Sequence, residues 1–246
     1  MRIFQKLTVS ELRLMLREPL VTFFAVVFPT LLVIILGSIP AFREPSPDLG
    51  GLRVIDLYVP ITLALILAML GLQTTPAVLA TYREKGVLRR LATTPARPIA
   101  LLGAQLVTSL AMAIFSGALV LLVGRFVFDV GLAQNPGAYF FSFLLAAAAV
   151  FAVGLFIAAV APSGKAANTI GTLLFFPSMF FAGLWAPREV MPGVIQRIGD
   201  FTPLGAGERA MHESFTGSWP ALISLTVLVG YVVVFGAVSA KLFRWE

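Results

Sequence analysis

Six long apolar runs, separated by polar segments, set the pattern of this chain. They occupy Leu20–Ile39, Leu57–Leu79, Ile99–Val123, Tyr139–Ala161, Ala166–Leu184 and Pro220–Lys241. A helix of about 20 apolar residues crosses a bilayer core about 30 Å thick. A helix satisfies its backbone hydrogen bonds within itself, whereas a membrane-spanning barrel would show short alternating segments. The pattern therefore predicts an all-α integral membrane protein with six transmembrane helices, formed by residues 1–246 as a single domain.

The first polar segment, residues 1–19, has the features of a short helix before the first span. Thr8 lies three residues before Glu11, which is the spacing of a capping box, and Pro19 ends the segment. One side of this helix is apolar, with Val9, Leu12, Met15 and Leu16. We expect an interfacial helix that lies on the cytoplasmic leaflet, and the alternative is an ordinary basic flank.

The second polar segment, residues 80–98, combines basic residues with a small apolar ridge. The ridge is formed by Val87, Leu88 and Leu91, and it is surrounded by Arg83, Lys85, Arg89 and Arg90. We expect the stretch Thr81–Pro95 to form a short cytoplasmic helix that ends before Pro95, because the residue before a proline disfavours the helical conformation. Such a ridge suits a groove in a partner protein. The alternative is that the leucines rest on the membrane surface.

The third polar segment, residues 185–219, contains several prolines among apolar and polar residues. This favours short, broken helices that re-enter the membrane, shielded by the spans. The alternative is a surface loop of ordinary character. His212, the sole histidine of the chain, is interpreted as a surface residue of this segment.

Composition supports a membrane environment. Of the 246 residues, 59% are hydrophobic and 12% charged, whereas soluble domains carry about 25% charged residues. Two-thirds of the 18 basic residues lie in segments on one side of the six spans. Basic residues favour the cytoplasmic side, so both termini are predicted to be cytoplasmic. The basic pI near 10.2 therefore indicates topology, and no nucleic-acid partner is expected.

The spans are nearly free of ionisable residues, which argues against ion-coupled transport. Their strongest polar groups are Gln73, Gln105 and Asn168. No nucleotide site is expected either: the Gly164-Lys165 pair lacks the glycine five residues before Gly164 and the Ser or Thr after Lys165 that a P-loop requires. No catalytic residue, metal site or cofactor is expected in this chain, which has no cysteine.

Two motifs resemble a known family. The first runs Arg83-Glu84-Lys85-Gly86, Leu88, Leu91, Thr94-Pro95, Leu101 and Gly103. The second runs Phe181-Ala182-Gly183-Leu184-Trp185-Ala186-Pro187, Met191-Pro192, Ile195, Thr202-Pro203-Leu204 and Glu208. Together with the hydropathy pattern, they are similar to type-2 ATP-binding-cassette (ABC) exporter permeases, in particular those of the daunorubicin-resistance type.

The resemblance implies an assembly of two permeases and two separate ABC ATPase subunits, which would hold ATP and Mg²⁺. It implies coupling to the ATPase through Arg83, Glu84, Gly86, Leu88, Arg89, Leu91 and Pro95. It also implies an extracellular gate that includes Trp185, Pro187, Pro192, Pro203 and Glu208. The assembly would lie in the cell membrane of a prokaryote, as a permease homodimer.

The apolar stretch Phe175, Phe176, Met179 and Phe180 is a candidate wall of the substrate pathway, and packing against lipid or neighbouring helices is the alternative. Ala167 and Gly171 permit close helix approach, a weak indication of a dimer interface. We expect outward movement of a hydrophobic or amphipathic molecule, such as a drug, lipid or secondary metabolite. The rival functions are an ATP-independent channel and a membrane scaffold or assembly protein.

Overall fold

The computed structural model describes residues 2–49, 51–92 and 98–242, and its regular elements are helices. Among these residues no strand forms, and an isolated bridge joins Pro45 to Arg53. Five helical stretches of the described chain are long and apolar enough to cross a membrane. They are Pro19–Ser38, Val54–Glu84, Ile99–Phe128, Pro136–Val160 and Leu222–Leu242.

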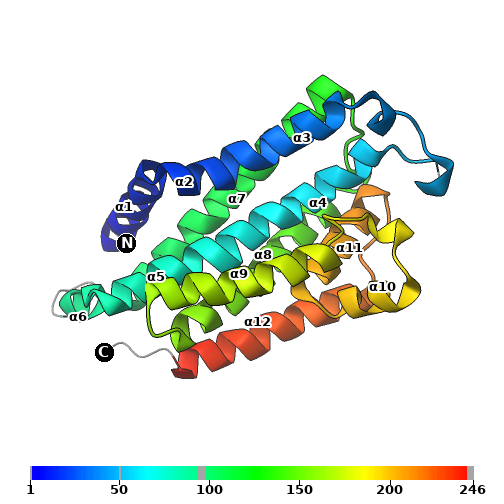
Figure 1. Ribbon diagram of the computed structural model, residues 1–246. Coiled ribbons are helices and arrows are strands. Elements are labelled where there is room, and N and C mark those ends of the chain that lie inside the picture. Colours follow the sequence, from blue (N-terminus) through cyan, green and yellow to red (C-terminus); the bar gives the residue numbers. More distant parts are fainter. Residues whose placement is uncertain (1, 50, 93–97, 243–246) are drawn as a thin grey trace.

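These stretches are built from named elements that run side by side as a bundle (Figure 1). The first combines α2 (Pro19–Thr22), η1 (Phe23–Val27) and α3 (Phe28–Ser38), and the second combines α4 (Val54–Ala68), η4 (Met69–Thr74) and α5 (Thr75–Glu84). The others are α7 (Pro98–Phe128), α8 (Pro136–Val160) and α12 (Leu222–Leu242). The predicted all-helical membrane fold is confirmed at this level.

The helix α9 (Gly164–Phe181) occupies the position of the predicted fifth span. It packs beside α5 and η4, and it has 18 residues. Lys165 and Asn168, together with several small polar residues, make it less apolar than the five candidate spans. The sixth span therefore stays a prediction.

The second helical stretch is the axis of the bundle. Within its most apolar window 78% of the residues are buried, compared with 17% in α12. The helices α3, α7, α8 and α9 contact it on its different sides. The outer faces of α7 and α12 carry the exposed apolar side chains expected of a surface in contact with lipid, including Phe115, Phe126 and Val233.

Two of the spans contain a π-helical segment immediately before a proline. The segment η1 precedes Phe28-Pro29, and η4 precedes Thr75-Pro76. Proline lacks a backbone N–H, and its ring collides with the carbonyl four residues earlier, so a regular helix is disfavoured there. A wider π turn accommodates the proline without breaking the span.

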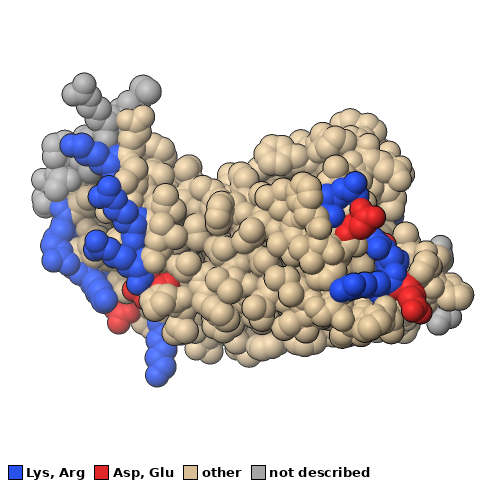
Figure 2. Space-filling model, turned by 90° about the horizontal axis from the view of Figure 1, so that it is seen from above, with Lys and Arg blue, Asp and Glu red and all other residues tan. Residues whose placement is uncertain are grey.

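The remaining elements gather at the two ends of the bundle (Figure 1). At one end, the α6 end, lie α1 (Arg2–Arg17) and α6 (Val87–Ala92). At the other, the α11 end, lie η2 (Pro40–Phe42), η3 (Pro47–Leu49), η5 (Arg188–Val190), α10 (Gly193–Asp200) and α11 (Pro203–Phe215). Figure 2 shows mostly basic side chains with a few acidic ones along the α6 end, both signs of charge at the α11 end and an uncharged band between them.

The expected capping box before α1 is wrong. The helix already begins at Arg2, so Thr8 lies inside it and donates its hydroxyl to the carbonyl of Phe4 at 3.0 Å. Glu11 turns into the bundle, where it is 6% exposed and accepts a hydrogen bond from Tyr82 at 2.9 Å. The local pattern predicted that the carboxyl group of Glu11 lies at the start of a helix, whereas tertiary packing places it inside the bundle.

Candidate functional site

The predicted polar segment that begins at residue 80 contains the end of α5 and the separate helix α6 rather than one helix. The helix α5 ends at Glu84, and Gly86 then adopts a left-handed conformation with φ +66°. A residue with a side chain is strained at that angle, so glycine ends α5 here and lets the chain turn into α6. The prediction of one short helix within Thr81–Pro95 is corrected accordingly. We refer to residues 75–92 as the coupling segment.

Leu88 points into the bundle and not toward a partner. Its side chain is 1% exposed and belongs to a small core with Leu79, Leu101 and Ala158. Val87 and Leu91 pack against the same core and are half-buried. The expected docking ridge is therefore corrected, because its central leucine anchors α6 to α5, α7 and α8.

The solvent-facing side of the coupling segment is basic. Lys85, Arg89 and Arg90 are exposed, and Arg90 donates to the carbonyl of Lys85 at 3.0 Å. Figure 2 shows the basic character of this end of the molecule. Pro95, the last residue expected to act in coupling, lies outside the described residues.

Arg83 binds the end of a different span. Its Nη1 donates to the carbonyls of Ala158 and Ala159 at 3.0 Å each, and its Nη2 donates to the carbonyl of Ala161. These carbonyls belong to the last turn of α8 and the residue after it. A helix leaves its last carbonyls without partners and its C-terminus partly negative, so an arginine satisfies both.

Glu84, the next residue, binds the start of the following helix. Its Oε2 accepts from the backbone N–H of Gly164, the first residue of α9, at 3.0 Å. A carboxylate at a helix N-terminus satisfies an unpaired N–H and interacts favourably with the helix dipole. Two adjacent residues at the end of α5 therefore hold both sides of the turn between α8 and α9. We call Arg83 and Glu84 the clamp.

Close packing reinforces the clamp. A Cβ at Gly164 would collide with the hydroxyl of Thr81, and one at Gly171 would collide with the carbonyl oxygen of Leu72. The Ala167–Gly171 pair, considered for a dimer interface, is thus buried within the chain against the second span. The second span and α9 are therefore in close contact.

The four candidate residues of the substrate pathway separate into two groups. Phe175 and Met179 are buried within the chain. Phe176 is 52% exposed, and Phe180 is half-buried. Phe175 and Phe176 make a T-shaped ring contact with centroids 5.5 Å apart. Two of the four therefore lie in the core, and the other two remain candidates for a surface along a pathway.

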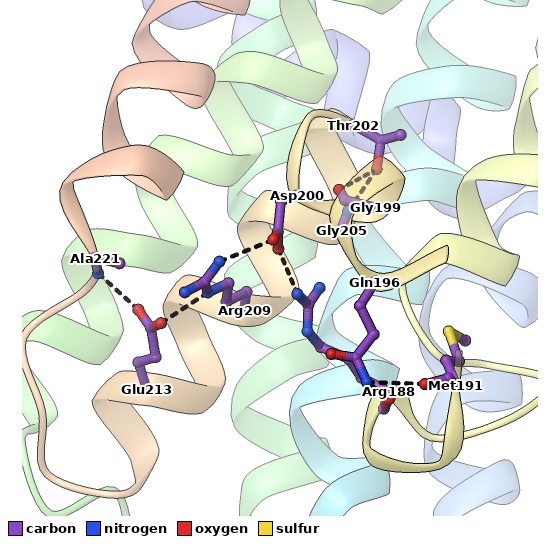
Figure 3. A network of polar contacts seen from close by, with 10 residues as sticks. All are labelled: Arg188, Met191, Gln196, Gly199, Asp200, Thr202, Gly205, Arg209, Glu213 and Ala221. Carbon is purple, nitrogen blue, oxygen red and sulfur yellow. Dashed lines mark hydrogen bonds and ion pairs between the residues drawn. The ribbon is translucent and has the colours of Figure 1, made fainter. Parts of the chain in front are cut away.

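At the α11 end, a polar network joins η5, α10, α11 and the start of the last span (Figure 3). Asp200 binds Arg188 at 2.5 Å and Arg209 at 3.0 Å, and Arg209 also binds Glu213 at 2.8 Å. Glu213 in turn accepts from the backbone N–H of Ala221 at 2.6 Å. The network fixes the short elements of this end relative to one another.

The residues expected to form an extracellular gate occupy different environments around this network. Pro203 is buried in the first turn of α11, where Thr202 caps the helix through a 3.1 Å bond from the N–H of Gly205. Trp185 and Pro192 are exposed, and Pro187 is half-buried. The structure brings Pro203 and Glu208 together in α11, while Trp185 and Pro192 lie on the surface.

Glu208 is the most deeply buried carboxyl of this end. It is 4% exposed, and its Oε2 has no hydrogen-bond partner among the described residues. Burial raises the pKa of Glu208 to about 8, and the neighbouring Glu189 adds to the effect while Arg188 opposes it. Its carboxyl group is therefore largely protonated at neutral pH.

The sequence did not indicate that Glu11, Asp200 and Arg209 make polar contacts that join different elements. Each lies in a polar segment, where a charged residue gives no signal of burial. The i, i+4 spacing of Arg209 and Glu213 was the available clue, because residues four apart share a helix face.

Comparisons with known proteins agree with this arrangement. Residues 2–216 match the family model described as ABC-2 type transporter. The chain is 21% identical over 248 residues to the putative transport permease YvfS of Bacillus subtilis (strain 168), covering 99% of this chain and 98% of that protein. It is 29% identical over 203 residues to the daunorubicin resistance ABC transporter permease protein DrrB1 of Streptomyces coeruleorubidus, covering 77% and 69%.

The structure is a bundle of long apolar helices with an uncharged central band, and the family model matches most of the sequence. The chain belongs to the ABC-2 type transporter family and is a multi-pass membrane subunit of an ABC transporter.

Proposed function

We propose that this chain is the permease of an ABC exporter that moves a hydrophobic or amphipathic molecule outward. The energy would come from ATP, bound with Mg²⁺ and hydrolysed in a separate ATPase subunit. The clamp carries this proposal: Arg83 and Glu84 connect the coupling segment to both α8 and α9. A push on α6 by the ATPase would then be passed to three spans at once.

The exposed basic face of the coupling segment is the proposed contact with the ATPase. Lys85, Arg89 and Arg90 are exposed there, while Leu88 holds α6 in place from inside. Charged residues on such a surface speed association and select the partner. Leu88 and Gly86 would act indirectly, by setting the position and direction of α6.

A second copy of the permease would cover the outer face of α9. Asn168 is exposed on this helix, and a polar side chain that faces hydrocarbon is costly. A pathway or a partner helix on that face would remove the cost, and two-fold assemblies are the commonest closed oligomers.

With α9 as a sixth span, both termini lie in the cytoplasm, and the α11 end forms a re-entrant gate on the outer side of a prokaryotic cell membrane.

Co-purification tests the proposed partner. The tagged permease is co-expressed with candidate ABC ATPase subunits, and the ATPase retained on the affinity resin is measured. We expect Arg89→Glu to lower retention roughly fivefold, a cost of about 1 kcal/mol. Arg197→Glu is the matched control, because Arg197 is exposed at the opposite end. Equal retention by wild type and Arg89→Glu would refute the proposed contact.

A further inference from the structure

Two adjoining cavities form a groove between the first and second helical stretches. Their volumes are about 450 Å³ and 210 Å³. They share four lining residues, namely Val21, Thr74, Ala77 and Val78. The groove therefore runs without interruption from α1, at the α6 end, to the level of η4. We call it the α2–α5 groove.

The walls of the groove are largely apolar, and both π-helical segments contribute to them. Phe24 comes from η1, and Met69 comes from η4. Leu14 and Met15 of α1 line the wider end. A π turn interrupts the regular hydrogen bonding of a helix, and such turns occur often at functional sites. Because two of them line this groove, the groove is a candidate functional site.

The wider end of the groove is lined by two carboxyl groups and an amide, from Glu11, Glu18 and Gln105. Glu11 is 6% exposed, and Tyr82 donates a hydrogen bond to its Oε2. Gln105 is 3% exposed, lines the cavity, and makes no side-chain hydrogen bond to any described residue. Neither Glu11 nor Glu18 forms an ion pair within the described part of the chain. A ligand that donates hydrogen bonds to these groups would bind favourably, because polar groups in a largely apolar groove are stabilised by a partner.

The narrower end supplies two further polar groups. Gln73 and Asn168 both line it. The three strongest polar residues of the predicted spans, including Gln105, thus lie along one groove. A long apolar wall with carboxyl groups at one end and isolated amides along it matches an amphipathic molecule with a cationic head.

We propose that the α2–α5 groove binds an amphipathic molecule that carries a protonated amine. The ammonium group would lie between Glu11 and Glu18 and close to Gln105, and the apolar body would extend along α5 toward Gln73 and Asn168. Lys85 also lines the wider end, so the two carboxyl side chains outnumber the lysine by one, which favours a ligand with a single positive charge. This inference rests on the proposed export function and names the chemical class of the molecule exported.

Binding can be measured without any ATPase. The probe is dansylcadaverine, a fluorescent amphipathic amine, and its N-acetylated form has the same body without the charge. The full-length protein is placed in phosphatidylcholine nanodiscs, and fluorescence anisotropy gives the two affinities. We expect the wild type to bind the amine at least tenfold more tightly than the acetylated form, because only the amine can donate charge-assisted hydrogen bonds to the carboxyl groups.

Substitutions in the groove separate charge from shape. Glu11→Gln keeps the size of the side chain and an acceptor for Tyr82. In this variant the affinities for the amine and for its acetylated form should become equal. Glu18→Gln, at an exposed position, should reduce the preference a few-fold without affecting folding, whereas Glu44→Gln at the α11 end should change nothing. Val78→Phe should weaken both ligands by filling the groove. A wild type without preference for the amine, or a preference that survives Glu11→Gln, would overturn the proposal.

Nanodiscs with phosphatidylethanolamine distinguish the source of the amine. Loss of dansylcadaverine binding in these discs would identify a lipid amine as the natural ligand, and unchanged binding would identify a diffusible amine. Failure of the export function would leave this binding intact, while failure of the amine site would leave ATPase retention intact.

Discussion

At the residue scale, the clamp shows how two adjacent side chains can connect three helices. Arg83 and Glu84 stood out in the sequence as part of a basic, apolar-ridged segment. Their targets could not be predicted, because the bonded backbone atoms lie 75 to 80 positions further along the chain. The same holds for Leu88, whose burial depends on the way α6 folds back on the bundle.

Loss of the Arg83 side chain should destabilise the bundle. Arg83→Ala leaves the carbonyls of Ala158 and Ala159 without this partner, and a charge-assisted hydrogen bond contributes about 1.5–3 kcal/mol. We expect a cost of at least about 2 kcal/mol, seen as a lower Tm of the protein in detergent. Arg197→Ala, at an exposed position, should leave Tm unchanged. Equal Tm values for both variants would show that the clamp does not stabilise the fold.

Glu208 should make stability depend on pH. Its pKa is raised to about 8 in the folded protein from 4.5, so the folded state holds a proton that the unfolded state releases. The contribution of Glu208 to the free energy of unfolding is therefore full below pH 4.5. It is lost as the pH rises toward 8, by up to roughly 5 kcal/mol. Glu208→Gln should flatten the fall in Tm between pH 5.5 and 8.5, whereas Glu44→Gln should not. A wild-type Tm that rises over this range would contradict the account.

At the element scale, the sequence predicted the long helices well but not their irregularities. Length and apolarity alone locate the spans, because both are required by the bilayer. Pro29 and Pro76 lie directly after η1 and η4, but a proline in the sequence does not distinguish a kink from a π turn. The close glycine contacts depend on which helices become neighbours, as in the approach of Gly171 to Leu72.

Gly171→Ala should separate α9 from the second span. The new methyl group would meet the carbonyl oxygen of Leu72 in the backbone, which cannot move aside as a flexible side chain can. Overpacking of this kind costs about 1–3 kcal/mol. Gly236→Ala in α12 is the control, since a Cβ there has open space. The measurement is the Tm in detergent, and a Gly171→Ala protein as stable as the control would disprove the tight contact.

At the scale of the whole molecule, the charged side chains lie at the two ends of the bundle, which would face opposite sides of a membrane. The basic α6 end and the mixed-charge α11 end enclose a band without charge (Figure 2). Composition predicted this arrangement. The sixth span could not be derived as firmly, because α9 carries Lys165 and Asn168, both exposed, and is therefore less apolar than the other spans.

The orientation can be tested with single cysteines, since the natural chain has none. Arg89→Cys and Arg197→Cys place a thiol at exposed positions of opposite ends. In intact cells, a membrane-impermeant maleimide should label the second variant and spare the first, and both should react after lysis. Labelling of Arg89→Cys in intact cells would reverse the proposed topology.

The central claim is that ATP hydrolysis in a separate subunit drives transport through the clamp. The most direct test is ATP-dependent uptake of dansylcadaverine into inverted membrane vesicles that contain the permease and its ATPase. Uptake should require ATP, should fall in Glu84→Ala while the ATPase stays bound, and should persist in Glu84→Gln, which can still accept from Gly164. Uptake that is equal with and without ATP, or unaffected by Glu84→Ala, would contradict the account.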